Sequence, residues 1–241
     1  MKKVKIGGNI VLEYDKSLPE GDKNIWLRKD LQPNSVIQNI YKEGTITINN
    51  KKEKLTSAVS PCEGYYLYRL IKLNKFTKIL EVGMANGLSS LYMTQALKEL
   101  DNDGKLISID PFQDTQWHCV GKNHIKKANL ENYHELIQEV DYFALPRVLK
   151  EHGNNSFDLI FIDGMHLFDY TLLDMFYAFM LIKINGVIVI DDIKHFGPAK
   201  CEKYFDTNYK FLKKINGPCS TVATYIKIKE DDRLWNFHKD F

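Results

Sequence analysis

Four acidic side chains and one histidine stand where buried strands are expected to end. Asp110 follows the apolar run KLISI, Asp163 follows FDLIFI, and Asp191 and Asp192 follow VIVI, with His166 three residues after Asp163. Ligands of parallel α/β sheets bind beyond the carboxyl ends of the strands. These side chains are therefore expected to gather at one edge of a sheet, where they could bind a cation or the hydroxyl groups of a ligand.

Asp163, Asp191 and Asp192 form a candidate metal site. Adjacent parallel strands lie about 4.8 Å apart, so carboxylates at neighbouring strand ends can share one divalent cation. Three carboxylates suit Mg²⁺ or Mn²⁺, and without a cation they would repel one another. The alternative is that Asp163 with Gly164 is only a turn and that Asp192 caps a helix.

His166 is a candidate catalytic base, because imidazole titrates near neutral pH and can accept a hydroxyl proton. The alternatives are a structural histidine beside the metal and a residue at the start of a helix. His195 follows Asp192 closely enough to reach the same pocket, but a solvent-exposed side chain is the expected state.

A second candidate site lies in the stretch ILEVGMANGLSS. Lys78 to Val82 is a short apolar run that predicts a buried strand, and the spacing after it predicts a helix with Ser89 or Ser90 as its N-cap. Gly83 and Gly87 bracket the loop between them. Glycines allow a backbone to approach a ligand closely, so this turn predicts a nucleotide-sized crevice.

The residues around this crevice narrow the class of ligand that it could bind. The loop lacks both the GxGxxG spacing of dinucleotide binders and the Lys-Ser/Thr of a P-loop. Glu81, just ahead of the glycines, suits a cationic amino acid part better than a pyrophosphate. Asp110, at the end of the next strand, can accept hydrogen bonds from both hydroxyls of a ribose.

The elements that position these residues alternate between strand and helix from Lys78 to Ile190, which predicts a doubly wound, mostly parallel sheet. The expected strands are 78–82, 105–110, 135–140, 157–163 and 187–190, followed by an antiparallel pair at 209–215 and 221–229. Helices are expected after the glycine loop, over 144–153, and over 167–182, where Asn185 and Gly186 form the turn that ends the helix.

Residues 1–58 predict an N-terminal cap, and residues 59–241 predict the main domain. Val4 to Tyr14 could form an interrupted strand, and Thr45 to Ile48 a short strand before the Asn49-Asn50 turn. Ser60, Pro61 and Glu63 form a capping box that predicts a helix running to about Asn74.

Composition excludes some functions. The chain has 33 basic and 31 acidic residues and a net charge of +2, which disfavours a dedicated nucleic-acid binder. Its four cysteines are widely spaced, which predicts reduced thiols in a cytoplasmic protein. No apolar run is long enough to predict a membrane span or a signal peptide.

ILEVGMANGLSS, ISIDP, FDLIFIDGMH and NGVIVIDD together resemble the class I S-adenosylmethionine-dependent methyltransferases. The resemblance is strongest to metal-dependent small-molecule O-methyltransferases of the catechol, caffeoyl-CoA and macrolide-sugar types. It covers about residues 60–241 and implies a seven-stranded sheet. Two positions depart from the catechol pattern, since Asp192 stands for an Asn and His166 for a catalytic lysine.

The resemblance implies roles for individual residues. Glu81, Gly83 and Gly87 would surround the methionine part of S-adenosylmethionine, with Ser89 near its carboxylate. Asp110 would hold the ribose. The remaining residues would be Asp141 and Tyr142 beside the adenine, Asp163 between cofactor and metal, Asp191 and Asp192 on the metal, and His166 as base.

The sequence thus predicts methyl transfer from S-adenosylmethionine to a hydroxyl of a small molecule, assisted by Mg²⁺ or Mn²⁺. The Asp191-Asp192 pair favours a sugar or another polyhydroxylated acceptor, and a homo-oligomer is compatible with the aromatic C-terminus. Two alternatives remain at this point: an NAD-type enzyme, which the glycine spacing disfavours, and a non-catalytic module that retains the methyltransferase fold.

Overall fold

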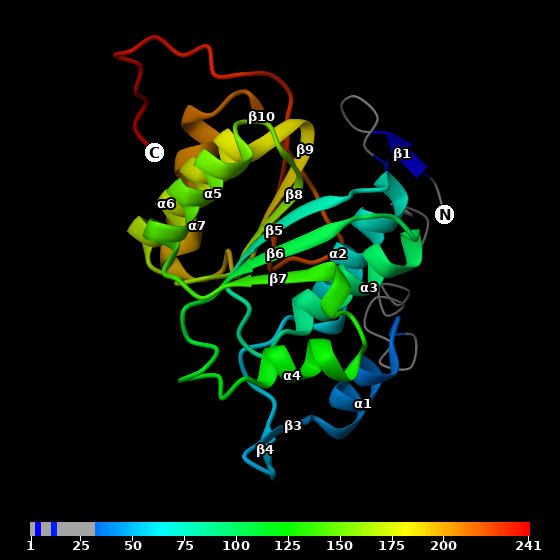
Figure 1. Cartoon of the computed structure of the whole chain (residues 1–241). Helices are drawn as coiled ribbons and strands as arrows, with labels where there is room; N and C mark the ends of the chain where they lie inside the picture. The colour runs from blue at the N-terminus through cyan, green and yellow to red at the C-terminus, as the bar shows by residue number, and fades with distance from the viewer. Residues whose placement is uncertain (1–2, 6–10, 14–31) are drawn as a thin grey trace.

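The computed structural model describes residues 3–5, 11–13 and 32–241. Its centre is a seven-stranded sheet with the strand order β10-β11-β9-β8-β5-β6-β7 (Figure 1). The strands are β5 (Lys78–Val82), β6 (Lys105–Ile109), β7 (His134–Ile137), β8 (Phe157–Ile162), β9 (Ile182–Ile190), β10 (Leu212–Ile215) and β11 (Ala223–Lys227).

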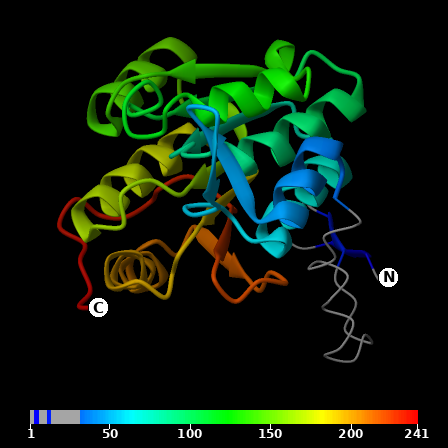
Figure 2. The ribbon, with the colours of Figure 1, turned by 90° about the horizontal axis from the view of Figure 1, so that it is seen from below.

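Helices cover both faces of this sheet (Figures 1 and 2). One layer contains α1 (Ser35–Glu43), α2 (Pro61–Asn74), α3 (Leu88–Leu100) and α4 (Val120–Lys127), and the other α5 (Asp141–His152), α6 (Phe168–Leu181) and α7 (Phe196–Asn208). Successive strand residues point to opposite faces. Ile79 accordingly packs toward the first layer and Leu80 toward the second, so each face of the sheet has its own apolar core.

The register brings the ends of the central strands together. β5 pairs in parallel with β6 and β8, and β8 pairs in parallel with β9. β11 runs antiparallel to β9, and β10 antiparallel to β11. The predicted doubly wound sheet, with its antiparallel pair at the C-terminal end, is therefore confirmed. The carboxyl ends of β5, β6, β8 and β9 lie along one edge.

Several predicted boundaries are wrong. The helix expected over 167–182 ends at Leu181, and the chain enters β9 directly at Ile182, so Asn185 and Gly186 lie within the strand. Isoleucines 182 and 184 favour a strand because their branched side chains restrict χ1 in a helix. The expected third strand ends at Ile137, and α5 begins at Asp141 instead of residue 144.

The N-terminal part adds β1 (Lys3–Lys5), β2 (Val11–Glu13) and the hairpin β3 (Thr45–Ile48) to β4 (Lys51–Lys54). The expected strand over 4–14 falls partly outside the described residues. α1 packs into the same core as α2 and α3, and the Tyr41 hydroxyl donates to the Val59 carbonyl at 2.6 Å. The domain boundary at residue 58 stays a prediction.

The predicted capping box is present. The Ser60 hydroxyl accepts from the Glu63 amide, and the Glu63 carboxylate accepts from the Ser60 amide at 2.6 Å. The prediction of four reduced thiols is wrong, because Cys62 and Cys219 form a disulfide with a Cα–Cα distance of 6.2 Å. The two cysteines are 157 residues apart, a distance across which sequence spacing gives no signal for pairing.

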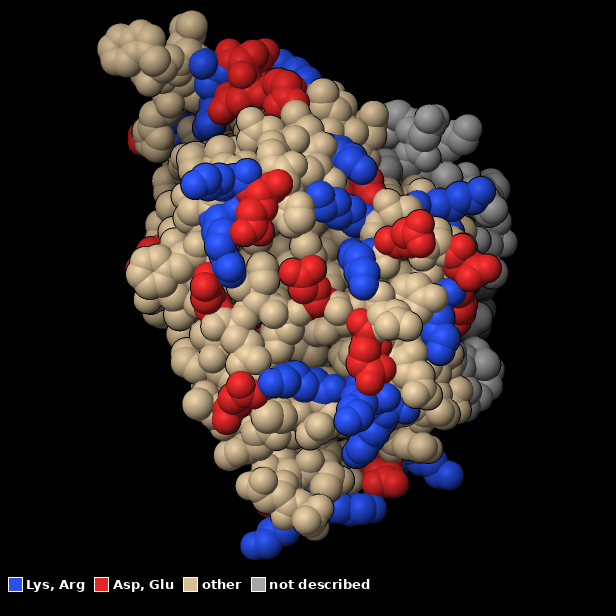
Figure 3. Space-filling model, in the orientation of Figure 1, with Lys and Arg blue, Asp and Glu red and all other residues tan. Residues whose placement is uncertain are grey.

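On the face drawn in Figure 3, basic and acidic side chains are interspersed, in line with the near-balanced charge of the sequence. Within residues 3–5, 11–13 and 32–241, none of the helices combines the length and apolar character that a membrane span requires.

Candidate active site

A cavity of about 400 Å³ opens at the carboxyl edge of the sheet. It lies beyond the ends of β5, β6 and β8 and beside the start of α5. The five predicted site residues that line it are Gly83, Asp110, Asp141, Tyr142 and Asp163. Its other walls are mainly apolar and aromatic: Val82, Ala85, Ile109, Pro111, Phe112, Gln116, Trp117, Val140, Gly164, Met165 and Tyr170.

The floor of the cavity requires a glycine after β5. Gly83 has φ +88°, and a Cβ there would stand 2.1 Å from the Asp163 carbonyl oxygen. Any other residue would separate the β5 turn from the end of β8. Gly87 has φ +75° and packs its backbone against Gly121 of α4. It positions the loop without lining the cavity.

Asp110 holds the glycine loop in place. Its Oδ2 accepts from the amides of Met84 and Ala85 at 3.1 and 2.7 Å and from Gln113 Nε2 at 3.1 Å. Its Oδ1 accepts from the Phe112 amide at 2.8 Å. The carboxylate therefore fixes the loop and also lines the cavity. Gln113 also donates to the Ala85 carbonyl at 2.7 Å and so helps to position the loop.

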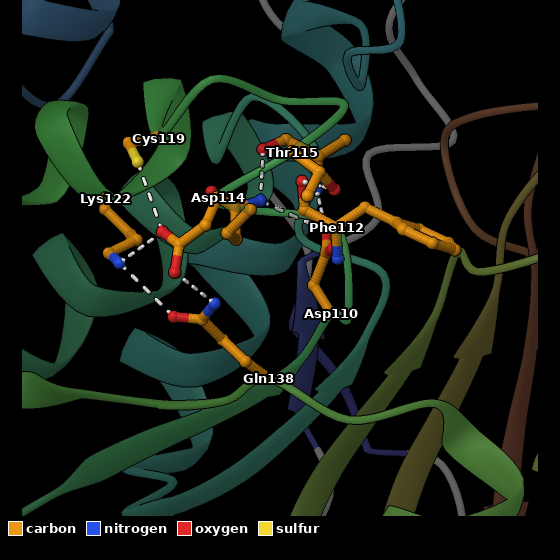
Figure 4. A network of polar contacts seen from close by, with 9 residues as sticks. Asp110, Phe112, Asp114, Thr115, Cys119, Lys122 and Gln138 are labelled. Carbon is orange, nitrogen blue, oxygen red and sulfur yellow. Dashed lines mark hydrogen bonds and ion pairs between the residues drawn. The ribbon is translucent and has the colours of Figure 1, made fainter.

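The loop after Asp110 forms the aromatic wall, and Asp114 anchors it (Figure 4). Lys122 Nζ and Gln138 Nε2 bind the two oxygens of Asp114 at 2.7 and 2.8 Å. The hydrogen bond from Lys122 holds the pKa of Asp114 below its usual range. These contacts tie the segment carrying Phe112 and Trp117 to α4 and to the end of β7.

Glu81 does not line the cavity. Its carboxylate is buried and accepts hydrogen bonds of 2.5 Å from the hydroxyls of Ser89, Ser90 and Ser108. Burial raises the pKa of Glu81 to about 7, and the three hydroxyls partly oppose this shift. The expected roles of Glu81 and Ser89 beside the ligand therefore do not fit these side-chain positions.

The predicted N-cap is also wrong. α3 begins after Gly87, and neither serine caps it through its side chain. Ser89 and Ser90 instead bind Glu81 across the base of the helix. A strand residue followed by serines eight and nine positions later could have indicated this contact, because the first turn of α3 lies close to the end of β5.

The structure brings part of the predicted metal site together at the ends of β8 and β9. The Asp163 amide donates to the Val82 carbonyl and the Asp191 amide to the Ile162 carbonyl, which sets the two acids at the ends of neighbouring strands. His166 Nε2 lies 3.4 Å from Asp163 Oδ1 and 3.4 Å from Asp192 Oδ2. The imidazole therefore sits between two of the predicted metal ligands.

The electrostatics of this cluster are unbalanced. Burial and then the Asp163 charge raise the pKa of Asp191 to about 9. Burial raises the pKa of Asp163 to about 6, and its hydrogen bond with His166 raises the pKa of that imidazole. The described part of the chain supplies no Lys or Arg ion pair to these acids. A divalent cation fits such a donor set.

His195 lies beside this cluster, which its position soon after Asp192 in the sequence allows. Its Nε2 lies 3.7 Å from Asp192 Oδ1, and its ring stacks on His166 with centroids 5.2 Å apart. His166, Asp192 and His195 together offer three ligand atoms within 4.8 Å of one another. The side chain is nevertheless 61% exposed, so it combines the expected exposure with the proximity to Asp192 that the sequence spacing allows.

Comparison with known proteins identifies the family. A methyltransferase domain model matches residues 80–193. A catechol O-methyltransferase of Niastella koreensis is 32% identical over 185 residues, covering 73% of this chain and 80% of that protein. The chain belongs to the family of S-adenosylmethionine-dependent O-methyltransferases.

Other members of this O-methyltransferase family match over shorter stretches. A flavonoid 3′,5′-methyltransferase of Vitis vinifera is 30% identical over 138 residues, covering 56% of this chain and 55% of that protein. The chain spans about half the length of this relative and of a caffeoyl-CoA O-methyltransferase of Populus kitakamiensis, of which 54% is covered.

Solved structures share the fold. An O-methyltransferase from Bacillus cereus in complex with SAH has a TM-score of 0.62 at 18% identity, covering 86% of this chain and 96% of that one. The O-methyltransferase of tomaymycin synthesis from Streptomyces achromogenes, in complex with SAM, has a TM-score of 0.61 at 18% identity, covering 86% and 94%. At this identity the likeness establishes the fold alone.

Proposed function

We propose that this protein transfers the methyl group of S-adenosylmethionine to a hydroxyl oxygen of a small molecule. The observation that carries the proposal is the position of Asp163. It lines the cavity beyond β5, β6 and β8 and also belongs to the cluster with Asp191, Asp192 and His166. A methyl donor bound in the cavity and an acceptor bound at the cluster would therefore both lie beside Asp163.

The cavity fits the donor by shape and chemistry. Gly83 leaves the β5 turn open to close backbone approach, and Asp110 stands at the end of β6, where a ribose would be held. Asp141 and Tyr142, with the aromatic wall of Phe112 and Trp117, suit a planar base. Glu81 and Ser89 would act behind the loop, by fixing the start of α3.

The cluster would hold the acceptor oxygen. Asp163, Asp191 and Asp192 would bind Mg²⁺ or Mn²⁺, a cation that lowers the pKa of a bound hydroxyl. His166 would take the hydroxyl proton, since it lies among these carboxylates and its neutral form accepts one proton. As the oxygen–carbon bond forms, the carbon–sulfur bond breaks, giving a methyl ether and S-adenosylhomocysteine. The protein contributes alignment and exclusion of water.

A labelled methyl donor tests this function. S-adenosylmethionine carrying a labelled methyl group is incubated with Mg²⁺ and with catechols, sugars and other polyhydroxylated compounds as separate acceptor pools. The expected result is label in a methyl ether, with one S-adenosylhomocysteine formed per transfer. Binding of NAD without binding of S-adenosylhomocysteine would overturn the proposal, and full activity in excess chelator would overturn the cation assignment.

Matched variants distinguish catalysis from a binding role. Asp163→Ala and Asp191→Ala should abolish transfer, whereas a non-catalytic module would keep its function in both.

The proposal also includes a small-molecule partner, no nucleic-acid partner, and assembly as a homo-oligomer. The sequence also predicted a cytoplasmic location, whereas a disulfide such as Cys62–Cys219 persists mainly in oxidising compartments.

A further inference from the structure

Asp174 is a buried acid with no role in the chemistry described above. It lies on α6, is 1% exposed, and neither of its oxygens has a hydrogen-bond partner among the residues that the structure describes. Its carboxyl group faces that of Asp141 at the start of α5. Its Oδ2 also lies 3.6 Å from the position that a Cβ on Gly164 would take, directly beneath the cavity.

Two buried carboxyl groups this close do not both carry a charge. Burial raises the pKa of Asp174 well above its usual value, and the charge of Asp141 raises it further. Asp141 is nearer to solvent, at 9% exposure. The Cys201 thiol of α7, which also faces Asp174, is kept neutral because burial raises its pKa. The proton of the pair therefore resides on Asp174, which becomes a hydrogen-bond donor.

Asp141 is the acceptor within reach of that donor. One of its oxygens, Oδ1, accepts from the Tyr142 amide at 2.7 Å. A hydrogen bond from Asp174 would fix the carboxylate from behind, leaving lone pairs directed at the cavity that Asp141 lines. The surrounding wall there is apolar and aromatic, formed by Ile109, Trp117, Val140 and Tyr142. A flat base carrying an amino group matches one carboxylate set in such a wall.

We propose that Asp174 is a positioning residue that orients Asp141 to accept a hydrogen bond from the 6-amino group of an adenine, so that the cavity selects 6-amino over 6-oxo purines. This inference rests on the proposed function, because the adenine belongs to S-adenosylmethionine. Asp141 touches the base, whereas Asp174 acts only through Asp141.

The test compares two ligands that differ at this one group. Calorimetry measures the dissociation constants of S-adenosylhomocysteine and of its 6-oxo analogue, S-inosylhomocysteine. The wild type should prefer the amino compound by roughly ten- to hundred-fold, because a hydrogen bond to a charged group contributes about 1.5–3 kcal/mol. Asp174→Ala should lower this preference about tenfold.

Three further variants make the result specific. Asp174→Asn should retain the preference within about threefold, since its amide can donate to Asp141. Asp174→Val is a second donor-free variant if the alanine variant does not fold, and thermal unfolding identifies the folded variants. Asp169→Ala is the matched control, an exposed aspartate on the same helix, and should leave both constants unchanged.

The binding measurements distinguish a failure of the proposed function from a failure of the inference about Asp174. If the wild type does not bind S-adenosylhomocysteine, the proposed function is wrong. If the wild type binds both ligands equally, or if folded Asp174→Ala and Asp174→Val keep the full preference, the inference about Asp174 is wrong while the proposed function stands.

Discussion

Glu81 and Asp191 are both buried acids on the central sheet, but their surroundings differ. Glu81 receives three serine hydroxyls. Asp191 receives the Asp192 amide at 2.7 Å and otherwise faces the charges of Asp163 and Glu63. Burial raises both pKa values, to about 7 for Glu81 and about 9 for Asp191. A buried acid supplied with donors can stabilise a fold, whereas one facing other acids is neutralised either by a proton or by a bound cation.

Removing the Asp191 charge should have the largest effect on catalysis. Asp191→Asn is expected to lower methyl transfer at least about hundredfold, because it removes a ligand of the proposed cation. Steady-state turnover with saturating Mg²⁺ measures this loss. Activity within about threefold of wild type would contradict the role of Asp191 in the cluster.

The same variant should be more stable than the wild type when metal is absent. Asp191 has a folded-state pKa of about 9, raised above the unfolded value of about 3.9. The contribution of Asp191 to the free energy of unfolding is therefore complete below about pH 4, and it is lost as the pH rises through about 9. Urea unfolding at pH 8 in chelator should show Asp191→Asn stabilised by at least about 1 kcal/mol. A stability difference between the wild type and Asp191→Asn that is the same at pH 4 and pH 8 would contradict the raised pKa of Asp191.

Replacing His166 should have the next largest effect. His166→Ala is expected to lower kcat about hundredfold, as removal of a general base does. The hydrogen bond with Asp163 raises the pKa of His166, and the base must be neutral to act. The wild-type kcat should therefore fall with acid, with a midpoint above the usual value of about 6.5. A profile unchanged in His166→Ala would exclude the base.

Glu81 variants should affect stability more than chemistry. Glu81→Ala leaves three buried hydroxyls without their acceptor and opens a cavity, so we expect a loss of about 2–4 kcal/mol in unfolding free energy. Turnover of the folded variant should fall less than tenfold. Glu81→Gln should lower the unfolding free energy by about 1 kcal/mol. The wild type should lose stability as the pH rises through about 7, the folded-state pKa of Glu81. The glutamine variant should not show this pH-dependent loss. Loss of turnover without loss of stability would reverse this assignment.

His195→Ala should have the smallest effect. The imidazole lies beside Asp192 but is 61% exposed, so we expect less than a threefold change in kcat. It serves as the matched control for His166→Ala, because the two rings stack on each other. A loss as large as that of His166→Ala would make His195 an equal member of the cluster.

Residue patterns predicted the central strands β5, β6 and β8 and the end of β9, because these are mostly apolar runs ended by glycine or aspartate. The placing of Asp163 and Asp191 at neighbouring strand ends followed from the parallel pairing of β8 with β9. The direction of the Glu81 side chain did not follow, because every residue around it in β5 is buried. The Cys62–Cys219 bond and the Asp141–Asp174 contact join distant segments, and sequence spacing does not indicate such pairs.

Manganese binding tests the contrast between the two acids most directly. Electron paramagnetic resonance counts the Mn²⁺ ions bound per chain for the wild type, Asp191→Asn and Glu81→Gln, each with S-adenosylhomocysteine present. We expect one bound ion in the wild type and in Glu81→Gln, and at least a tenfold weaker affinity in Asp191→Asn. Equal affinity in all three proteins would contradict it, because the acids at the ends of β8 and β9 would then not hold the cation.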